Sequence, residues 1–266
     1  MSSFSIEQNE RVTYKVHHED EHLLVVAKPA RLVTQPGIGH DRGSLLNGLF
    51  ARYGARLQNL GAARDFGLVH RLDAETSGLL AVALSIEAYE GLRRAFEQRV
   101  VRKFYWAIVW KRPKRTSGVV RLNLAEQVVS TGRYTQASAA RVVRSGKPAL
   151  TAYRVLGTSE VASVLECRPV TGRLHQIRVH MDAIGCPVLG DPLYGPRAAR
   201  QASPRLALHA HRLAFAHPVS GEPLDVRTGF PRDLRATLRL MRLERPDLPA
   251  TPTCDEAPEP TDDGDA

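Results

Sequence analysis

The chain has 266 residues, of which 43% are hydrophobic and 24% are charged, a composition typical of a globular protein with a sizeable core. No run of apolar residues reaches the roughly 18 needed for a membrane helix, and the N-terminus has no signal-peptide pattern. The three cysteines lie far apart without a C-x-x-C spacing, which argues against a disulfide framework and against a zinc site. We therefore expect a cytoplasmic protein that makes no membrane contact.

Charge is divided unevenly along the chain. The net charge is +9, but no Lys or Arg follows Arg245, whereas seven acidic residues do, so the part up to Arg245 carries +16. A body this basic is typical of proteins that bind a polyanion such as nucleic acid. The acidic, proline-rich segment 246–266 is predicted to be a disordered tail that follows one catalytic domain over 1–245.

Hydrophobic periodicity predicts the elements of the first part of the chain. The first strand is expected to begin near residue 22, within 22–33. Apolar residues at helical spacing follow Ser44, which can cap a helix, and Ser85 can cap a second helix. Between these helices, the segment 67–84 places four ionisable side chains between two apolar runs.

Strand patterns dominate the second part, from about 101 to 170. A helix is predicted over 175–185, with Gly185 at its C-terminal end, and strands and a last helix follow between 206 and 243. This pattern predicts an α+β fold with a mixed, mainly antiparallel central sheet and flanking helices.

Two predicted elements place polar or aromatic side chains on one face. In the strand over 101–110, strict alternation separates Tyr105 from the face that carries Phe104 and Trp106. In the helix over 175–185, His175 and Arg178 are three residues apart and are expected to share a face.

The segment GLVHRLDAETSGLLAVAL (67–84) allows two interpretations from its residues alone. It can be two paired strands joined by a polar turn, in which Asp73 and Thr76 serve the turn and Gly78 relieves the backbone. Its residues alone leave equally open that the four ionisable side chains have a function beyond the turn.

Three longer segments, in their order along the chain, bear on this choice. HRLDAETSGLL, KFYWAIV and TGRLHQIRVHMDAIGCPVLGDPLYG together resemble the RluA-type RNA pseudouridine synthase family, and VVAKPARLVTQPG, SGKPALTAYRV and PRLALHAHRLAFAHP extend the likeness over about 20–228. The resemblance implies the pseudouridine synthase fold with a central RNA-binding cleft. It also implies isomerisation of uridine to pseudouridine in RNA, with no cofactor and no metal.

The resemblance assigns roles to individual residues. Asp73 matches the catalytic aspartate, which would attack the sugar C1′ or abstract a sugar proton. Tyr105 matches the tyrosine that stacks on the base, and Arg178 the arginine expected to pair with Asp73. Arg71 would fill the space of the flipped nucleotide. RNA contacts are further expected from four residues: Lys28, His70, Arg173 and His175.

The substrate is expected to be a hairpin of 23S rRNA or tRNA. Many relatives carry an N-terminal S4-type RNA-binding domain, but a first strand near residue 22 leaves no room for one here. We therefore expect the catalytic body to recognise RNA by shape, as a monomer.

Two other functions are weighed against this one. The first is a catalytically silent RNA-binding module, for which the basic body would suffice. The second is a metal-dependent hydrolase, although no H-E-x-x-H motif is present and His175 and His180 would diverge by about 140° on a helix. Its candidate ligands are His175, His180, His209, His211, Asp182 and Asp191.

Overall fold

The structure is a computed structural model that describes residues 4–37, 41–130 and 136–246. It contains two compact units: unit 1 consists of the described residues of 1–103 together with 209–228, and unit 2 of 104–208 together with 229–246. The tail predicted to be disordered lies outside the described residues from 247 onward. Within the described ranges, no helix is long and apolar enough to cross a membrane.

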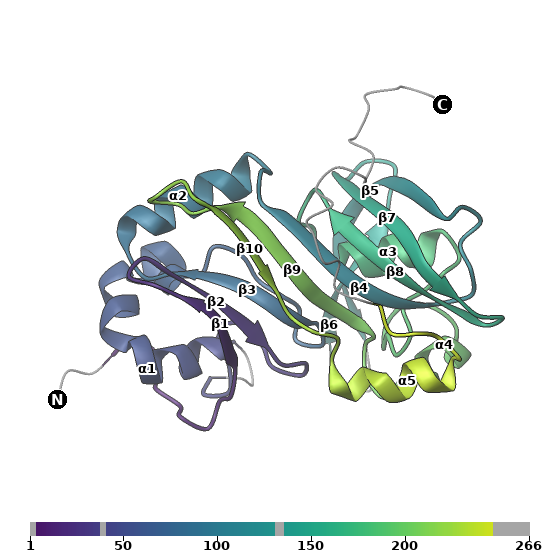
Figure 1. Ribbon diagram of the computed structural model, residues 1–266, viewed down its shortest axis with the longest axis horizontal. Coiled ribbons are helices and arrows are strands. Elements are labelled where there is room, and N and C mark those ends of the chain that lie inside the picture. The colour runs from purple at the N-terminus through teal and green to yellow at the C-terminus, as the bar shows by residue number, and fades with distance from the viewer. Residues whose placement is uncertain (1–3, 38–40, 131–135, 247–266) are drawn as a thin grey trace. The chain divides into compact units, whose positions relative to one another are not determined.

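Unit 1 is built on the strands β1, β2, β3, β9 and β10 (Figure 1). The first four follow one another in this order in the sheet, and β10 pairs with β9 off this path. Neighbouring strands are antiparallel, except that β3 and β9 are parallel. The strands are β1 (Lys15–Glu19), β2 (Leu23–Lys28), β3 (Ser77–Ala83), β9 (Leu208–Ala216) and β10 (Pro223–Arg227).

The prediction that the first strand begins near residue 22 is wrong, because β1 precedes it. The sequence of β1, KVHHE, has no alternation of apolar and polar residues that would predict a strand. In the structure, none of these five residues is fully buried. The strand forms instead by pairing with the buried strand β2.

The helices of unit 1 begin where their capping residues predict. Ser44 accepts a hydrogen bond from the backbone N of Asn47 and caps α1 (Leu45–Leu60), and Ser85 caps α2 (Ile86–Glu97) in the same way. A short 3-10 helix, η1 (Ala62–Gly67), follows α1. The buried face of α2 packs on apolar side chains of β2 and β3 in one core cluster.

Gly78 lets β3 approach β9 directly. It lies opposite Ala210 in the parallel register, with φ +122, and a Cβ built on it would stand 2.2 Å from the backbone oxygen of Ala210. Any side chain would therefore force the two strands apart. Gly78 is the second residue of β3, the strand that follows the Asp73 turn.

Unit 2 contains five antiparallel strands in the order β4-β8-β7-β5-β6. They are β4 (Arg102–Trp110), β5 (Ser117–Ser130), β6 (Gln136–Val142), β7 (Lys147–Thr158) and β8 (Ala162–Pro169). The helices are α3 (Gln176–Ala183), α4 (Arg197–Gln201), the 3-10 turn η2 (Arg232–Leu234) and α5 (Arg235–Leu240). The predicted α+β fold with a mixed, mainly antiparallel sheet is confirmed.

Strand β4 is buried on both faces, from Phe104 to Val109. The alternation that separates Tyr105 from Phe104 and Trp106 is present in the strand, but Tyr105 is itself only 8% exposed. Alternation of large and small apolar residues therefore marks two faces of β4 that are both largely buried.

Candidate active site

Asp73 lies on a turn that leads into β3. The backbone N of Thr76 donates to the backbone oxygen of Asp73 at 3.1 Å, and β3 starts at the next residue. The segment before the turn pairs with β3 through a bridge between Leu68 and Val82. The interpretation as two paired strands joined by a turn is correct for the turn and for β3, but the segment before the turn forms only this bridge and no strand. Asp73 is half-buried in the turn.

The residues on both sides of Asp73 are held by side chains from the end of β2 and from the loop that follows it. The Thr34 hydroxyl donates to the backbone oxygen of Leu72 at 2.9 Å and accepts from its backbone N at 3.3 Å. On the other side, the Lys28 ammonium donates to the backbone oxygen of Ala74 at 3.1 Å. Both ends of the turn are therefore fixed by groups from one segment.

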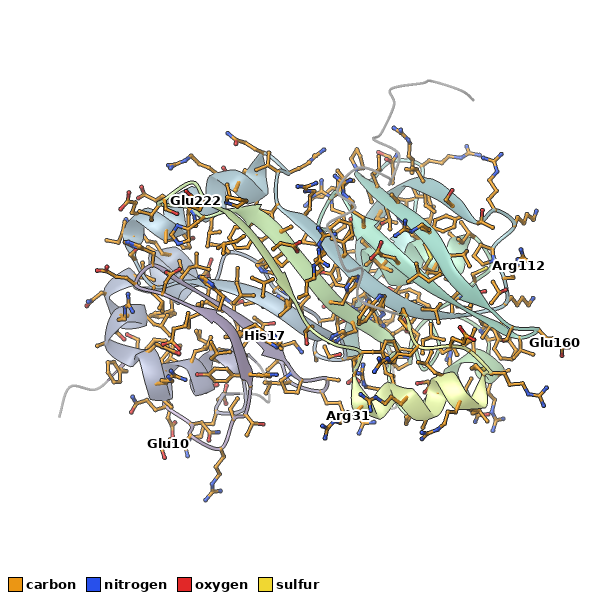
Figure 2. The ribbon with its side chains drawn as sticks, viewed as in Figure 1. Glu10, His17, Arg31, Arg112, Glu160 and Glu222 are labelled. Atoms are coloured by element: carbon orange, nitrogen blue, oxygen red, sulfur yellow. The ribbon has the colours of Figure 1, made fainter. Side chains whose placement is uncertain are left out.

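This geometry corrects the role predicted for Lys28. The side chain is 1% exposed, and its ammonium also donates to the backbone oxygens of Pro29 and Leu32, at 2.9 and 2.7 Å. A buried ammonium that is hydrogen-bonded to backbone carbonyls cannot reach a phosphate in solvent. Lys28 instead supports its own loop, from which the exposed Arg31 projects (Figure 2).

Arg71 and His70 precede Asp73 and have different surroundings. Arg71 is exposed and borders a hollow of about 280 Å³ next to the Asp73 turn. An exposed guanidinium beside a hollow suits the predicted insertion into an RNA stack. The other lining residues are Val33, Thr34, Gln35, Pro36, Gly37, Leu72 and Ala74.

His70 supports the sheet. Its Nε2 accepts a hydrogen bond from the backbone N of Ala81 at 2.9 Å, and its ring stacks on Phe96 with centroids 4.6 Å apart. Burial, and then the nearby charge of Lys103, lower the pKa of His70 to about 3. The ring is therefore neutral near pH 7 and carries no charge for a phosphate, which favours a structural role over the predicted RNA contact.

In unit 2, Arg178 is held by Asp191, a residue that was a candidate metal ligand in the hydrolase alternative. Its Nε and Nη2 donate to Oδ2 and Oδ1 of Asp191 at 2.7 and 2.8 Å, and the two side chains are 3% and 0% exposed. Asp191 also accepts from the backbone N of Leu193 and of Tyr194. The carboxylate thus orients the guanidinium from a fixed loop.

His175 and Arg178 meet at Tyr194. The ring nitrogen Nδ1 of His175 lies 3.0 Å from the Tyr194 hydroxyl, and the Arg178 guanidinium stands 5.1 Å from the centre of the same ring. His175 itself lies outside α3, at its N-terminal cap, with φ 52. The predicted helix therefore begins one residue later, yet the three-residue spacing still brings both side chains to one partner.

Arg173 lies at a basic edge of unit 2. Its Nε donates to the backbone oxygen of Pro148 at 3.2 Å, and its backbone N donates to the side chain of Gln176 at 3.0 Å. Together with Lys147 it borders a hollow of about 530 Å³. This placement is compatible with the predicted phosphate contact.

The predicted site residues belong to both units. Asp73 and Arg71 are in unit 1, whereas Tyr105 and Arg178 are in unit 2. The predicted pair between Asp73 and Arg178 joins the units and stays a prediction.

Four residues contact these groups in the structure but were not predicted to do so from the sequence. Thr34, Phe96 and Tyr194 were given no role, and Asp191 was given a different one. Asp191 and Tyr194 had a signal, because both stand in GDPLYG at the end of the third motif, and Thr34 had a weaker one, because it stands in VVAKPARLVTQPG.

The ligand set proposed for a hydrolase is not assembled in the described residues. There, no group of three or more His, Cys, Asp and Glu side chains is placed to hold a metal ion. Asp191 pairs with Arg178, and Nδ1 of His209 lies 2.8 Å from the Ser77 hydroxyl. The hydrolase interpretation has no geometric support in this part of the chain.

The mixed sheet with flanking helices defines an α+β fold, and comparison with known proteins shows the family to which this fold belongs. A family model described as RNA pseudouridylate synthase matches residues 22–183. Two solved human structures are similar to this chain. Human RNA Pseudouridylate Synthase Domain Containing 4 has a TM-score of 0.67 and 26% identity, and the match covers 88% of this chain and 95% of that chain. Human RNA Pseudouridylate Synthase Domain Containing 1 has a TM-score of 0.64 and 25% identity, and the match covers 91% of this chain and 100% of that chain.

Curated relatives agree with this family. Ribosomal large subunit pseudouridine synthase D of Nitrosomonas europaea is 40% identical over 242 residues, which are 88% of this chain and 67% of that protein. The protein of the same name from Zymomonas mobilis is 38% identical over 239 residues, or 87% and 74%. A third, from Neisseria meningitidis, is 37% identical, and the chain spans 63% of its length. The chain belongs to the RNA pseudouridine synthase family, a family of isomerases that act on RNA.

Proposed function

We propose that the chain converts specific uridines of structured RNA to pseudouridine, with Asp73 as the catalytic group. The observation that carries the proposal is the half-buried Asp73 carboxylate, presented on a turn that is fixed on both sides and preceded by the exposed Arg71. The names of the curated relatives support rRNA of the large ribosomal subunit as the substrate. Stem-loops of tRNA are the second candidate.

The reaction breaks the bond between N1 and C1′, turns the uracil, and joins C5 to C1′. The Asp73 carboxylate either attacks C1′ and later leaves, or removes a sugar proton. Tyr105 stacks on the uracil, and its hydroxyl serves the proton transfer at C5. Arg178 holds the aspartate in its charged form by a charge-assisted pair.

The uridine must leave its stack before C1′ and C5 are both accessible. Flipping costs a few kcal/mol, and less in a loop than in a duplex. Arg71, exposed beside the hollow next to the turn, takes the place of the extruded nucleotide. Arg173 and Lys147 contribute phosphate contacts, which give affinity without sequence information.

The variant Asp73→Asn tests the catalytic assignment. It keeps the shape of the side chain but removes its charge, so turnover should be lost while affinity for RNA stays within about twofold, because no phosphate contact is removed. Tritium release from RNA labelled at C5 of uridine measures turnover, since C5 loses its hydrogen when it becomes the glycosidic carbon. Substantial turnover by Asp73→Asn would contradict the proposal.

The substrate is proposed to be recognised by shape. A hairpin of about one and a half helical turns, taken from large-subunit rRNA or from a tRNA anticodon arm, should be modified almost as well as the full-length RNA. The control is the same loop sequence in an open strand at matched salt. Equal rates on hairpin and open strand would show that loop shape is not read.

The protein is proposed to work as a monomer and without a metal ion. Turnover should persist in EDTA, because an aspartate supplies the chemistry. If activity were lost on chelation and restored by one added metal, the hydrolase alternative would have to be reopened.

A further inference from the structure

We propose that Thr34 is a positioning residue for Asp73 that acts through the backbone of Leu72. The proposal rests on the proposed function, in which Asp73 is the catalytic group.

The Thr34 hydroxyl bonds to one residue twice. It donates to the backbone oxygen of Leu72 at 2.9 Å and accepts from the backbone N of Leu72 at 3.3 Å. The oxygen of Leu72 and the backbone N of Asp73 belong to one planar peptide unit. The Cα of Asp73 lies in the same plane, so a hydrogen bond that fixes this oxygen also fixes the orientation of the peptide plane from which the Asp73 side chain projects.

The interaction is sheltered from water. Thr34 is 4% exposed and Leu72 is 4% exposed, so neither backbone group of Leu72 has ready access to solvent in place of the hydroxyl. A buried donor or acceptor that loses its partner costs about 1–3 kcal/mol, and the chain would relax to recover it. That relaxation would take place one residue from the Asp73 carboxylate.

A second anchor limits the movement from the other side. The Lys28 ammonium holds the backbone oxygen of Ala74 at 3.1 Å, and the turn is closed by the bond from the Thr76 backbone N to the Asp73 oxygen. Lys28 ends β2, where it lies opposite Gly78 of β3. Together with these bonds, Thr34 provides a fixed point on the N-terminal side of Asp73, at the residue directly before it.

Such support matters because the carboxylate must meet one atom of the sugar. A displacement of about 1 Å in a reacting group costs on the order of 100-fold in rate, although binding of the remote parts of the substrate is unchanged. The loss of a positioning residue therefore lowers the rate of the chemical step and leaves the affinity for RNA intact.

The test compares three variants under single-turnover conditions with saturating enzyme. Thr34→Val keeps the shape of the side chain and removes the hydroxyl; it should lower the rate constant about 10- to 100-fold, with the Kd for RNA within about twofold. Thr34→Ser restores the hydroxyl and should recover most of the rate. Thr237→Val is the control: Thr237 is 1% exposed, and its hydroxyl lies 3.0 Å from that of Ser203, in unit 2.

The control separates positioning from general stability. Thr237→Val should lower the midpoint of unfolding without a loss of rate, because it removes an equally buried hydroxyl that bonds elsewhere. A rate for Thr34→Val within about threefold of the unsubstituted protein, or an equal loss in Thr237→Val, would overturn the proposal. If Thr34→Val does not fold, Thr34→Ala, which leaves space for water beside Leu72, is read by the same criteria.

Asp73→Asn belongs in the same series. An active Asp73→Asn protein would remove the proposed catalytic role, whatever Thr34 does. An inactive Asp73→Asn protein together with a normal Thr34→Val protein would overturn the positioning role alone.

Discussion

Arg178 and Asp191 form a two-point ion pair in the interior of unit 2, with donor to acceptor distances of 2.7 and 2.8 Å. Both residues belong to the third sequence motif: the arginine lies on α3, and the aspartate lies on the loop that follows this helix. The guanidinium is planar, and its Nε and Nη2 atoms are both bonded to Asp191. The direction of its third nitrogen, Nη1, is therefore also fixed.

Removal of Asp191 should therefore destabilise the protein strongly. Asp191→Ala leaves a buried guanidinium without this carboxylate, and breaking a pair of this kind costs about 3–5 kcal/mol of unfolding free energy. The matched control is Glu97→Ala, which removes the exposed partner of Arg93 on α2 and should cost less than about 1 kcal/mol. Urea denaturation measures the unfolding free energy of both variants. A similar loss in the two variants would show that burial does not determine how much an ion pair contributes to stability.

Gly78→Ala should be the most damaging small substitution near the Asp73 turn. The new Cβ would stand 2.2 Å from the backbone oxygen of Ala210 at a φ of +122, so the strand pair must separate, at an expected cost above about 3 kcal/mol. Gly157→Ala is the control, since nothing lies within 4 Å of a Cβ at that position. Chemical denaturation of the two variants should therefore differ widely, and comparable stabilities would mean that β3 and β9 are able to move apart.

Acid should destabilise the protein partly through His70. Burial and then Lys103 lower the pKa of His70 from 6.5 to about 3, so between these values the unfolded chain binds a proton that the folded chain excludes. The free energy of unfolding should fall as the pH decreases from 6.5 toward 3, and His70→Gln should make this fall smaller. Burial also lowers the pKa of His180, to about 4. His180 should therefore cause part of the loss of stability in acid, and this part should remain in the His70→Gln variant.

The measurement is the difference in unfolding free energy between pH 7 and pH 4 for both proteins. Glutamine has no titrating group, and its amide oxygen can accept the hydrogen bond from the Ala81 backbone. Identical differences in the two proteins would show that His70 does not contribute to the loss of stability in acid.

Much of the fold could be predicted, because local signals and packing agree in it. Ser44 and Ser85 begin helices as their side chains predict, and Tyr89 and Leu92 of α2 are buried as the helical spacing requires. The first strand, β1, was missed because it forms by pairing with β2 and has no apolar pattern of its own. Prediction from periodicity fails where a strand is polar at both faces.

The site was predicted less completely than the fold. Motif resemblance supplied Asp73 and Arg178, and Asp191, the partner of Arg178, stands in the same motif. Thr34 and Lys28, which hold the residues beside Asp73, come from distant positions, and no local pattern links Thr34 to Leu72. Lys28 shows the limit most clearly, since a lysine in a basic protein was expected to contact phosphate. Its burial depends on how the loop after β2 folds over the Asp73 turn, which sequence alone does not show.

Tyr105→Phe should separate stacking from proton transfer. The phenyl ring keeps the face against which the uracil is proposed to stack, so the affinity for RNA should change little. Loss of the hydroxyl should slow product formation by about 100-fold or more, the usual contribution of a general acid or base. Single-turnover assays on a hairpin, with Tyr105→Leu as the variant that also loses the ring, test this expectation, and a normal rate for Tyr105→Phe would exclude the hydroxyl from the reaction.

Deletion of residues 247–266 should change RNA binding through charge. The segment contains seven acidic residues and no basic ones, so its removal raises the net charge from +9 to +16. Folding and catalysis are expected to persist, whereas the affinity for an unrelated RNA should rise, most clearly at low salt where charge is least screened.

A second variant shows whether charge is the cause. Replacing the seven acidic residues by Asn and Gln keeps the length of the segment and should strengthen non-specific binding as much as the deletion does. The comparison uses the Kd for a scrambled RNA at two salt concentrations, because charge effects fall steeply as salt rises. If the deletion tightens binding and the neutral segment does not, the segment must hinder RNA by occupying space, and the charge argument fails.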